Sequence, residues 1–284
     1  MKYTAAVLIC STFGFGLPAQ AGEEAWRADG FAQPESALWD AARGHIYVSN
    51  IAGAPEAADG AGWISLLGAD GRVIAPQWSK GFDAPKGMAL AGGALWVADI
   101  TRLRRIDPDS GALLPSVELP GAVFLNDVAA DADGEGVYVS DMMTGVIWRA
   151  DAQGAVPYVS GLGLPNGIAV AQGVLFVATW GEGLHADFRT DHAGGLFRVD
   201  PASQEVTPVP GGGGLGNLDG LIADAQGGLI FSDFMAGRIA RLAQGDLREI
   251  AAPGLGSADI AAGDGVILVP MMMDNTLIAL PNTN

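Results

Sequence analysis

The fold of this chain is indicated by Val137-Tyr138-Val139-Ser140-Asp141, a short β-branched and aromatic run lying among glycines and aspartates. Such a run is typical of a buried strand and not of a helix. Runs of the same kind return five times, and successive first residues are separated by 49, 42, 38, 54 and 38 positions, a mean of about 44. This period predicts a repeated unit of β-structure. The other runs are residues 46–50 (IYVSN), 95–99 (LWVAD), 175–179 (LFVAT), 229–233 (LIFSD) and 267–271 (ILVPM).

Each run has further predicted strands beside it. A strand of small residues precedes it, starting 7 to 9 positions earlier, and a third strand often follows, as at residues 144–149 and 237–242. Small residues suit the innermost strand of a blade, where six sheets converge. Four strands in each repeat of this length predict an all-β, six-bladed β-propeller with four-stranded antiparallel blades. The small-residue strands are expected at residues 37–39, 87–90, 128–130, 167–170, 220–223 and 260–262.

The two ends of the repeat region are out of phase with the blades. After residue 267 there is room for two strands but not for an outer edge, whereas residues 24–31 precede the first repeat. We therefore expect this N-terminal strand to complete the last blade and close the ring, which removes exposed sheet edges. Two packed β-sandwiches, the other all-β possibility, predict neither the period nor the out-of-phase start.

Residues 1–21 have the pattern of a cleavable signal peptide. Lys2 precedes an apolar run from Ala5 to Leu17, and Ala19-Gln20-Ala21 has the small-x-small form of a cleavage site. The run is too short to favour a membrane span; a single anchoring helix and lipidation at Cys10 are the alternatives. We expect one propeller domain at residues 22–284, periplasmic or secreted, with no membrane span after cleavage.

Cysteine usage and charge exclude several kinds of function. Cys10 is the only cysteine, so the chain after residue 21 has no disulfide, no thiolate metal site and no cysteine nucleophile. The formal net charge is −17, which repels nucleic acid and anionic lipid surfaces but tolerates cations. A small-molecule substrate is the expected partner, and a nucleic acid is not.

One residue per repeat falls at the start of the innermost strand, where a propeller strand faces the axial channel. Five of the six are polar or charged, and four carry side-chain oxygens. Oxygen ligands select a hard cation, calcium before magnesium. Each residue alone is also explained as a turn residue, but their shared phase predicts a polar ring at one mouth of the channel. In order, the six positions are Glu35, Lys86, Asn126, Asn166, Asp219 and Ala258.

Short motifs surround the ring residues, namely Pro34-Glu35-Ser36, Leu125-Asn126-Asp127, Leu164-Pro165-Asn166-Gly167 and Leu218-Asp219-Gly220. Over nearly the whole chain after residue 21 they resemble the gluconolactonase/regucalcin (senescence marker protein) family of six-bladed propellers. The resemblance implies that Glu35, Asn166 and Asp219 bind one divalent metal, usually calcium, and that Asn126 contacts substrate or metal. It also implies a metal-dependent lactonase or esterase-type hydrolase, in which the metal polarises a lactone carbonyl and Asp219 is the candidate general base.

Two positions depart from related families. Pro85-Lys86-Gly87-Met88 is similar to the paraoxonases, which carry a histidine, often proposed as the base, at the position of Lys86. Regucalcin-like lactonases carry an arginine that grips sugar-acid substrates at the position of Phe124. Lys86 is therefore expected either to contact the substrate or a developing oxyanion, or only to offset the acidic ring.

Three loops are expected above the ring, at residues 51–62, 180–194 and 271–274. The second contains Trp180 and His185, which with Phe124 are the candidate substrate contacts. We interpret these loops as a pocket wall that sets substrate choice. No Gly-x-Ser-x-Gly elbow is present, so a Ser-His-Asp hydrolase has little support.

The fold alone does not decide between functions, because propellers host many. The four oxygen-bearing ring residues favour the calcium-dependent lactonase. The missing arginine and histidine favour a non-catalytic, calcium-stabilised propeller that binds a small ligand or a protein. A strictosidine-synthase-like propeller is a third possibility, with less support because that chemistry depends on an acidic residue in an apolar pocket.

Overall fold

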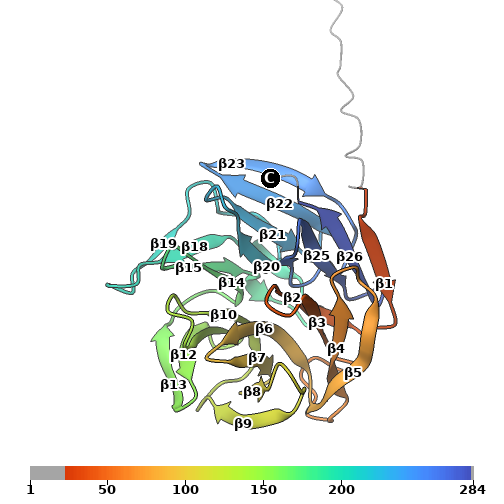
Figure 1. The fold of residues 1–284 in the computed structure, drawn as a ribbon. Coiled ribbons are helices and arrows are strands. Elements are labelled where there is room, and N and C mark those ends of the chain that lie inside the picture. The colour runs from red at the N-terminus through yellow and green to blue at the C-terminus, as the bar shows by residue number, and fades with distance from the viewer. Residues whose placement is uncertain (1–22, 283–284) are drawn as a thin grey trace, which may run out of the picture.

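The computed structural model describes residues 23–282, so the predicted signal peptide lies outside the described residues. The described chain forms six four-stranded antiparallel sheets arranged in a ring (Figure 1), which confirms the predicted six-bladed β-propeller. In the described part, no helix is long and apolar enough to span a membrane.

Blades one to five run from their innermost to their outermost strand in chain order. Blades one to three follow this order without interruption. Their strands are β2 (Pro34–Asp40), β3 (His45–Asn50), β4 (Gly62–Gly68), β5 (Val73–Phe82); β6 (Pro85–Ala91), β7 (Ala94–Asp99), β8 (Arg102–Ile106), β9 (Leu113–Glu118); β10 (Leu125–Ala130), β11 (Val137–Asp141), β12 (Val146–Asp151) and β13 (Gly154–Val159).

Blade four contains an inserted hairpin, and blade six uses the N-terminal strand. The hairpin, β16–β17, forms a two-stranded sheet of its own. The remaining strands are β14 (Pro165–Ala171), β15 (Val174–Thr179), β16 (Gly181–Leu184), β17 (Thr190–Ala193), β18 (Leu196–Val199), β19 (Val206–Pro208); β20 (Leu218–Ala223), β21 (Leu229–Asp233), β22 (Arg238–Ala243), β23 (Asp246–Ala251); β24 (Ala261–Ala262), β25 (Val266–Met271), β26 (Thr276–Pro281) and β1 (Trp26–Asp29).

The ring closes as the sequence predicts. Strand β1 pairs antiparallel with β26 from Trp26 opposite Ala279 to Asp29 opposite Thr276, and so supplies the outermost strand of blade six. Arg27 Nη1 also donates a hydrogen bond to the hydroxyl of Thr276 at 2.9 Å. The first strand of the described chain therefore holds the last blade against the first.

Blade six differs from the others at its innermost strand, which is only two residues long. The amide of Ala258 donates to the carbonyl of Pro270 at 3.0 Å, but Pro270 has no N–H to return the bond. The carbonyl of Ala258 accepts a hydrogen bond from Ser232 Oγ at 2.7 Å instead. A proline in the motif strand thus explains why the regular ladder starts late in this blade.

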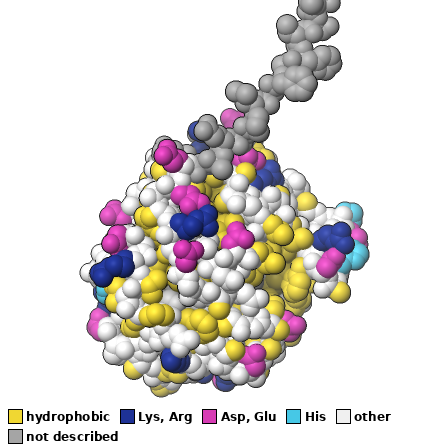
Figure 2. Space-filling model, turned by 90° about the vertical axis from the view of Figure 1, so that its right-hand side faces the viewer, with side chains coloured by type: hydrophobic (Ala, Val, Ile, Leu, Met, Phe, Trp, Pro, Cys, Tyr) yellow, Lys and Arg dark blue, Asp and Glu magenta, His cyan; other side chains and the backbone are white. Residues whose placement is uncertain are grey.

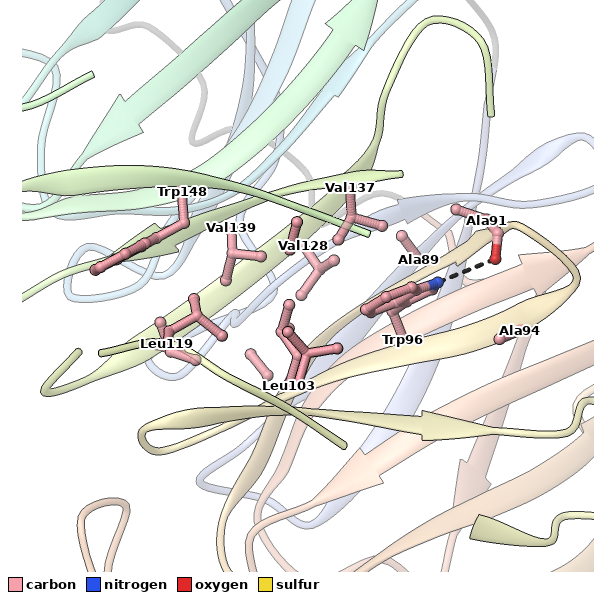
Figure 3. Close-up of a cluster of buried hydrophobic side chains, with 14 residues drawn as sticks. Ala89, Ala91, Ala94, Trp96, Leu103, Leu119, Val128, Val137, Val139 and Trp148 are labelled. Carbon is pink, nitrogen blue, oxygen red and sulfur yellow. Dashed lines mark hydrogen bonds between the residues drawn. The ribbon is translucent and has the colours of Figure 1, made fainter. Parts of the chain in front are cut away.

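The hydrophobic core is divided into layers between neighbouring blades. Along β11, Val137 and Val139 pack towards blade two, whereas Tyr138 on the opposite face packs towards blade four. Figure 3 shows the cluster between blades two and three, where Trp96 Nε1 donates to the carbonyl of Ala91 at 3.0 Å. Both faces of a middle strand are buried, so the repeated motif is an almost continuous apolar run.

Candidate functional site

The predicted ring positions are shaped by a β-bulge at the start of the innermost strand. In blade one, Pro34 pairs with Asn50 and Ala37 with Val48, so three steps along β2 match two along β3. The same shift occurs in blades two to five and always spans the ring residue and its successor. A bulge locally bends a strand and re-aims its side chains. Five ring residues line one cavity: Glu35, Lys86, Asn126, Asn166 and Asp219.

Ala258, the sixth ring position, is fully buried and is not among the residues that line this cavity. It lies in blade six, where the regular innermost strand is only Ala261–Ala262 and Ser257 pairs with Met271 in an isolated bridge. The polar ring is therefore incomplete on that side, as its alanine predicts.

The glycines that follow three ring residues allow the innermost strands to approach one another. A Cβ on Gly167 would collide with the backbone carbonyl of Asp219, and one on Gly220 with the amide nitrogen of Ile260. A Cβ on Gly87 would collide with Asp127. Only glycine fits where two backbones come this close, so these residues set the width of the channel.

Acidic and amide residues at the ends of the motif strands hold the segments that lead into the ring. Asp99 Oδ1 accepts hydrogen bonds from the amides of Asp83 and Ala84 at 3.0 and 2.9 Å, just before Lys86. Asp141 accepts from the amides of Val123 and Phe124, just before Asn126. These carboxylates are part of the support of the site and do not line the cavity.

Four ring residues carry a buried oxygen without a partner. These atoms are Glu35 Oε2, Asn126 Oδ1, Asn166 Oδ1 and Asp219 Oδ1, and all four residues are at most 5% exposed. Buried polar atoms are nearly always hydrogen-bonded, and an orphaned one costs about 1–3 kcal/mol. The four atoms lie at one site and belong to the four residues that the sequence proposes as metal ligands.

A hard divalent cation fits this donor set. All four orphaned atoms are oxygens, two from carboxylates and two from amides, as calcium prefers. Within residues 23–282 no group of three or more His, Cys, Asp or Glu side chains is arranged to hold a metal, so the candidate site depends on its two asparagines as much as on its acids.

The pKa values of the two ring carboxyls are raised. Burial raises the pKa of Glu35 well above its usual range, the carboxyls of Asp219 and Asp259 raise it further, and Lys86 opposes the shift. Burial and Asp259 likewise raise the pKa of Asp219 well above normal, and a hydrogen bond from Asn166 acts in the opposite direction. Because like charges are crowded together in a dry site, a bound cation would stabilise their ionised forms.

Two further buried carboxyls lie one position after the ring, and the sequence did not single them out. Asp127 accepts hydrogen bonds from the amide of Ile168 in blade four at 2.7 Å, and Asp259 accepts one from Ser36 Oγ in blade one at 2.6 Å. Burial raises the pKa of Asp259 to about 7. Each therefore links its blade to the next. The sequence could have indicated both residues, because Asp127 and Asp259 occupy the same position in their repeats, directly after the ring positions Asn126 and Ala258.

The ammonium of Lys86 is tied to backbone carbonyls. Its Nζ donates to the carbonyls of Pro55 and Ala84 at 2.9 and 3.0 Å and lies 4.5 Å from the ring centroid of Phe124. Burial lowers the pKa of Lys86, although Glu35 and Asp99 act in the opposite direction. Two of its three N–H donors are satisfied by the protein, which leaves one for a ligand.

The cavity above the ring has a volume of about 360 Å³ and a largely apolar wall. Phe124 and Trp180, two of the predicted substrate contacts, are buried and line it. The three predicted loops contribute as well, through Pro55, Phe188 and Met272. Ile51, the first residue of the predicted loop 51–62, also lines the cavity. Sequence reasoning missed the apolar lining that comes from outside these loops: Met142, Phe234, Met235 and Leu255.

His185 lies away from this cavity, on the hairpin β16–β17. Its Nε2 is 2.9 Å from Asp191 Oδ1, its side chain is 57% exposed, and it is not among the lining residues. The predicted substrate contact at His185 has no support from this geometry. His192 is also exposed on the hairpin, and it pairs with Glu182.

Comparison with solved structures confirms the expected resemblance at the level of the fold. A protein provisionally named a gluconolactonase has a TM-score of 0.69 and 18% identity, with 93% of each chain covered. Virginiamycin B lyase from Staphylococcus aureus has a TM-score of 0.59 and 17% identity, with 88% of this chain and 80% of that chain covered. A chain of a nidogen/laminin complex has a TM-score of 0.62 and 14% identity, with 87% and 88% covered.

Sequence comparison gives no further relative: no family model matches the chain, and no curated protein matches it significantly. At these identities the structural neighbours share the fold with this chain, and they range from enzymes to a protein complex. Its structure is thus similar to that of a gluconolactonase-like six-bladed propeller.

Proposed function

We propose that this protein is a calcium-dependent hydrolase of lactones or related cyclic esters. The observation that carries the proposal is the set of four orphaned oxygens on Glu35, Asn126, Asn166 and Asp219, buried at the base of a cavity of about 360 Å³. A similar fold in a protein provisionally named a gluconolactonase supports it. The cavity size is in the usual range for small-molecule sites, roughly 300–1,000 Å³.

The four oxygen-bearing residues would hold the cation, and a bound calcium ion would polarise the ester carbonyl of the substrate. Side chains of the protein would position the substrate and transfer the proton. Asp219 is the candidate base, because its buried carboxylate has a raised pKa and can accept a proton from an attacking water. The remaining N–H of Lys86 is available to the oxygen on which negative charge develops.

The proposed hydrolysis adds one water across the acyl C–O bond. The water oxygen bonds to the carbonyl carbon as its proton passes to Asp219. The bond from that carbon to the ring oxygen then breaks, and the leaving oxygen takes the proton. The product is a hydroxy acid, and Asp219 returns to its starting form.

A non-catalytic propeller stabilised by calcium is the second candidate. It is favoured by the inter-blade hydrogen bonds of Asp127 and Asp259 beside the ring, which show that carboxylates here hold blades together. The structural neighbour from the nidogen/laminin complex has a similar fold without being named an enzyme. A cation in the ring would then serve only stability.

The test is a calcium titration followed by turnover measurements. Metal-stripped protein is titrated with calcium by isothermal calorimetry, and aliphatic, aromatic and sugar lactones are then assayed by acid release. Asp219→Asn is compared with wild type, and Asp246→Asn on the exposed face of β23 is the matched control for loss of one carboxylate. Calcium binding with turnover that disappears only in Asp219→Asn supports the hydrolase.

The other outcomes separate the two candidates. Calcium binding without turnover above that of Asp219→Asn favours the non-catalytic propeller. Failure to bind calcium contradicts both candidates. An elimination product, which lacks the mass of the added water, would indicate a lyase and contradict hydrolysis.

A further inference from the structure

We infer that the cavity selects neutral lactones that carry one large apolar substituent, and that Phe188 sets this preference. The inference rests on the proposed function for the reaction but not for the shape of the site. Apart from Asp187, the polar residues that line the cavity are the ring residues, and the rest of the lining is apolar. A ligand that fits both must combine one polar reacting end with one apolar body.

The aromatic part of the wall has no free hydrogen-bonding group. Trp180 and Phe234 lie with ring centroids 5.5 Å apart at an interplanar angle of 52°. The indole Nε1 of Trp180, its only polar side-chain atom, donates to the carbonyl of Phe188 at 2.7 Å. Asn217 Nδ2 donates to the backbone carbonyl of Trp180 at 2.8 Å and holds the base of the hairpin. The wall is therefore fixed in place and offers only apolar contact.

Phe188 has an unusual backbone conformation at this wall. Its φ is +62°, in the left-handed region that bulky residues rarely occupy. Its side chain lines the cavity although the segment around it is exposed. Strained backbone conformations persist where the surrounding structure holds them and often occur at ligand sites. Here the Trp180 hydrogen bond holds the strained residue so that an aromatic ring, and not a polar group, faces the cavity.

The apolar surface continues to the mouth of the cavity. Leu255 and Met273 line it and are 51% and 60% exposed, among the most exposed large apolar side chains of the described residues. In Figure 2, apolar side chains gather beside a lobe that carries His, Arg and acidic side chains, as the hairpin β16–β17 does. An apolar substituent can thus extend from the cavity towards its rim while remaining in apolar contact.

Polyhydroxylated lactones fit this wall poorly. Among the described residues lining the cavity, the charged side chains are Glu35, Lys86 and Asp219 of the ring and Asp187, which Arg189 holds by a hydrogen bond of 2.8 Å. None of the arginines within residues 23–282 lines the cavity. Sugar hydroxyls against Trp180 and Phe234 would lose their water without gaining partners, which sites discriminate against strongly.

The experiment compares three lactones with the same six-membered ring. They are δ-valerolactone without a substituent, δ-decalactone with a pentyl chain and D-glucono-δ-lactone with hydroxyl groups. A fully buried methylene raises kcat/KM by about fourfold. With about half of the pentyl chain buried, δ-decalactone should exceed δ-valerolactone by at least ~10-fold, and D-glucono-δ-lactone should be the poorest substrate.

The matched variants are Phe188→Gly and Gln172→Gly. Both remove a side chain at a positive φ, where glycine relaxes the backbone, but Gln172 lies in an exposed turn far from the lining residues. Thermal melting should show that Phe188→Gly remains folded. Its ratio of kcat/KM for δ-decalactone to kcat/KM for δ-valerolactone should be at least threefold smaller than that of wild type. Gln172→Gly should keep the wild-type preference.

Binding is measured in parallel from tryptophan fluorescence, since Trp180 lines the cavity. Equal or faster turnover of D-glucono-δ-lactone would overturn the inference and leave the hydrolase intact. Binding that prefers δ-decalactone, without any turnover, would contradict the hydrolase and keep the inference about the cavity. A preference unchanged in Phe188→Gly would remove the role of Phe188.

Discussion

The substitution Asp219→Asn should change stability in opposite directions with and without calcium. Without calcium, Asp219 is a buried carboxyl whose pKa is raised by burial and by Asp259, and its Oδ1 has no partner. Asparagine keeps the shape and removes the charge. The metal-free variant should therefore be at least as stable as wild type near pH 7, because it lacks a carboxyl whose ionised form is disfavoured by burial and by Asp259.

With calcium the order should reverse, because the variant would lack one of the two carboxylates that are proposed to bind the cation. A ligand at one hundred times its Kd stabilises a protein by about 2.7 kcal/mol. If the substitution weakens binding about 100-fold, the same calcium concentration contributes only about 0.4 kcal/mol. For a domain of this size each kcal/mol shifts Tm by about 2–4 °C, so calcium should raise Tm by about 5–10 °C in wild type and about 1–2 °C in the variant.

The assay is differential scanning calorimetry of both proteins in EDTA and in a series of calcium concentrations. Asp246→Asn controls for loss of one exposed carboxylate and should behave as wild type in both conditions. If Asp219→Asn gained as much Tm from calcium as wild type, Asp219 would not be a ligand. If Asp219→Asn were much less stable than wild type in EDTA, the carboxylate of Asp219 would make stabilising contacts in the metal-free protein. That result would contradict the finding that its Oδ1 has no partner.

Three further changes test the ring and its support. The pKa of Asp259 is raised to about 7, so the metal-free folded state keeps a proton that the unfolded state releases above about pH 4. The free energy of unfolding, measured by urea titration, should therefore fall by up to about 4 kcal/mol between pH 4 and 7. A rise over this range would contradict the raised pKa. Lys86→Met should lower kcat/KM at least tenfold and leave calcium affinity within about threefold, and unchanged turnover would limit Lys86 to offsetting the acids. Gly167→Ala should cost about 1–3 kcal/mol because its Cβ meets the backbone of Asp219, while Gly213→Ala, with open space around it, should be neutral in the same denaturation assay.

The period of the motif strands was enough to predict the blades. A middle strand such as β11 is buried on both faces between two neighbouring blades, so every copy needs the same apolar run. The out-of-phase N-terminal segment likewise predicted the closing contact of β1 with β26. The short innermost strand of blade six could not be predicted in the same way. The missing N–H of Pro270 removes a ladder hydrogen bond to Ala258, and only the structure shows that these two residues are paired.

The ring residues could be predicted because a repeat converts sequence phase into spatial position. Glu35, Asn126, Asn166 and Asp219 occupy one phase, and the bulge that aims them into the channel recurs with them. Asp127 and Asp259 were missed although they follow the same rule, since their carboxyls pair with the next blade and only the structure shows that contact.

The sequence by itself determined the number of blades, the closing strand and the membership of the polar ring, because these depend on periodicity along the chain. Only the tertiary structure decided which ring oxygens remain without partners, that Lys86 is held by Pro55 and Ala84, and that Phe188 lines the cavity while His185 does not. Pro55, Phe188 and His185 lie in loops, which have no period, and their surroundings come from blades far apart in sequence. Their place is therefore set by packing and by long-range hydrogen bonds.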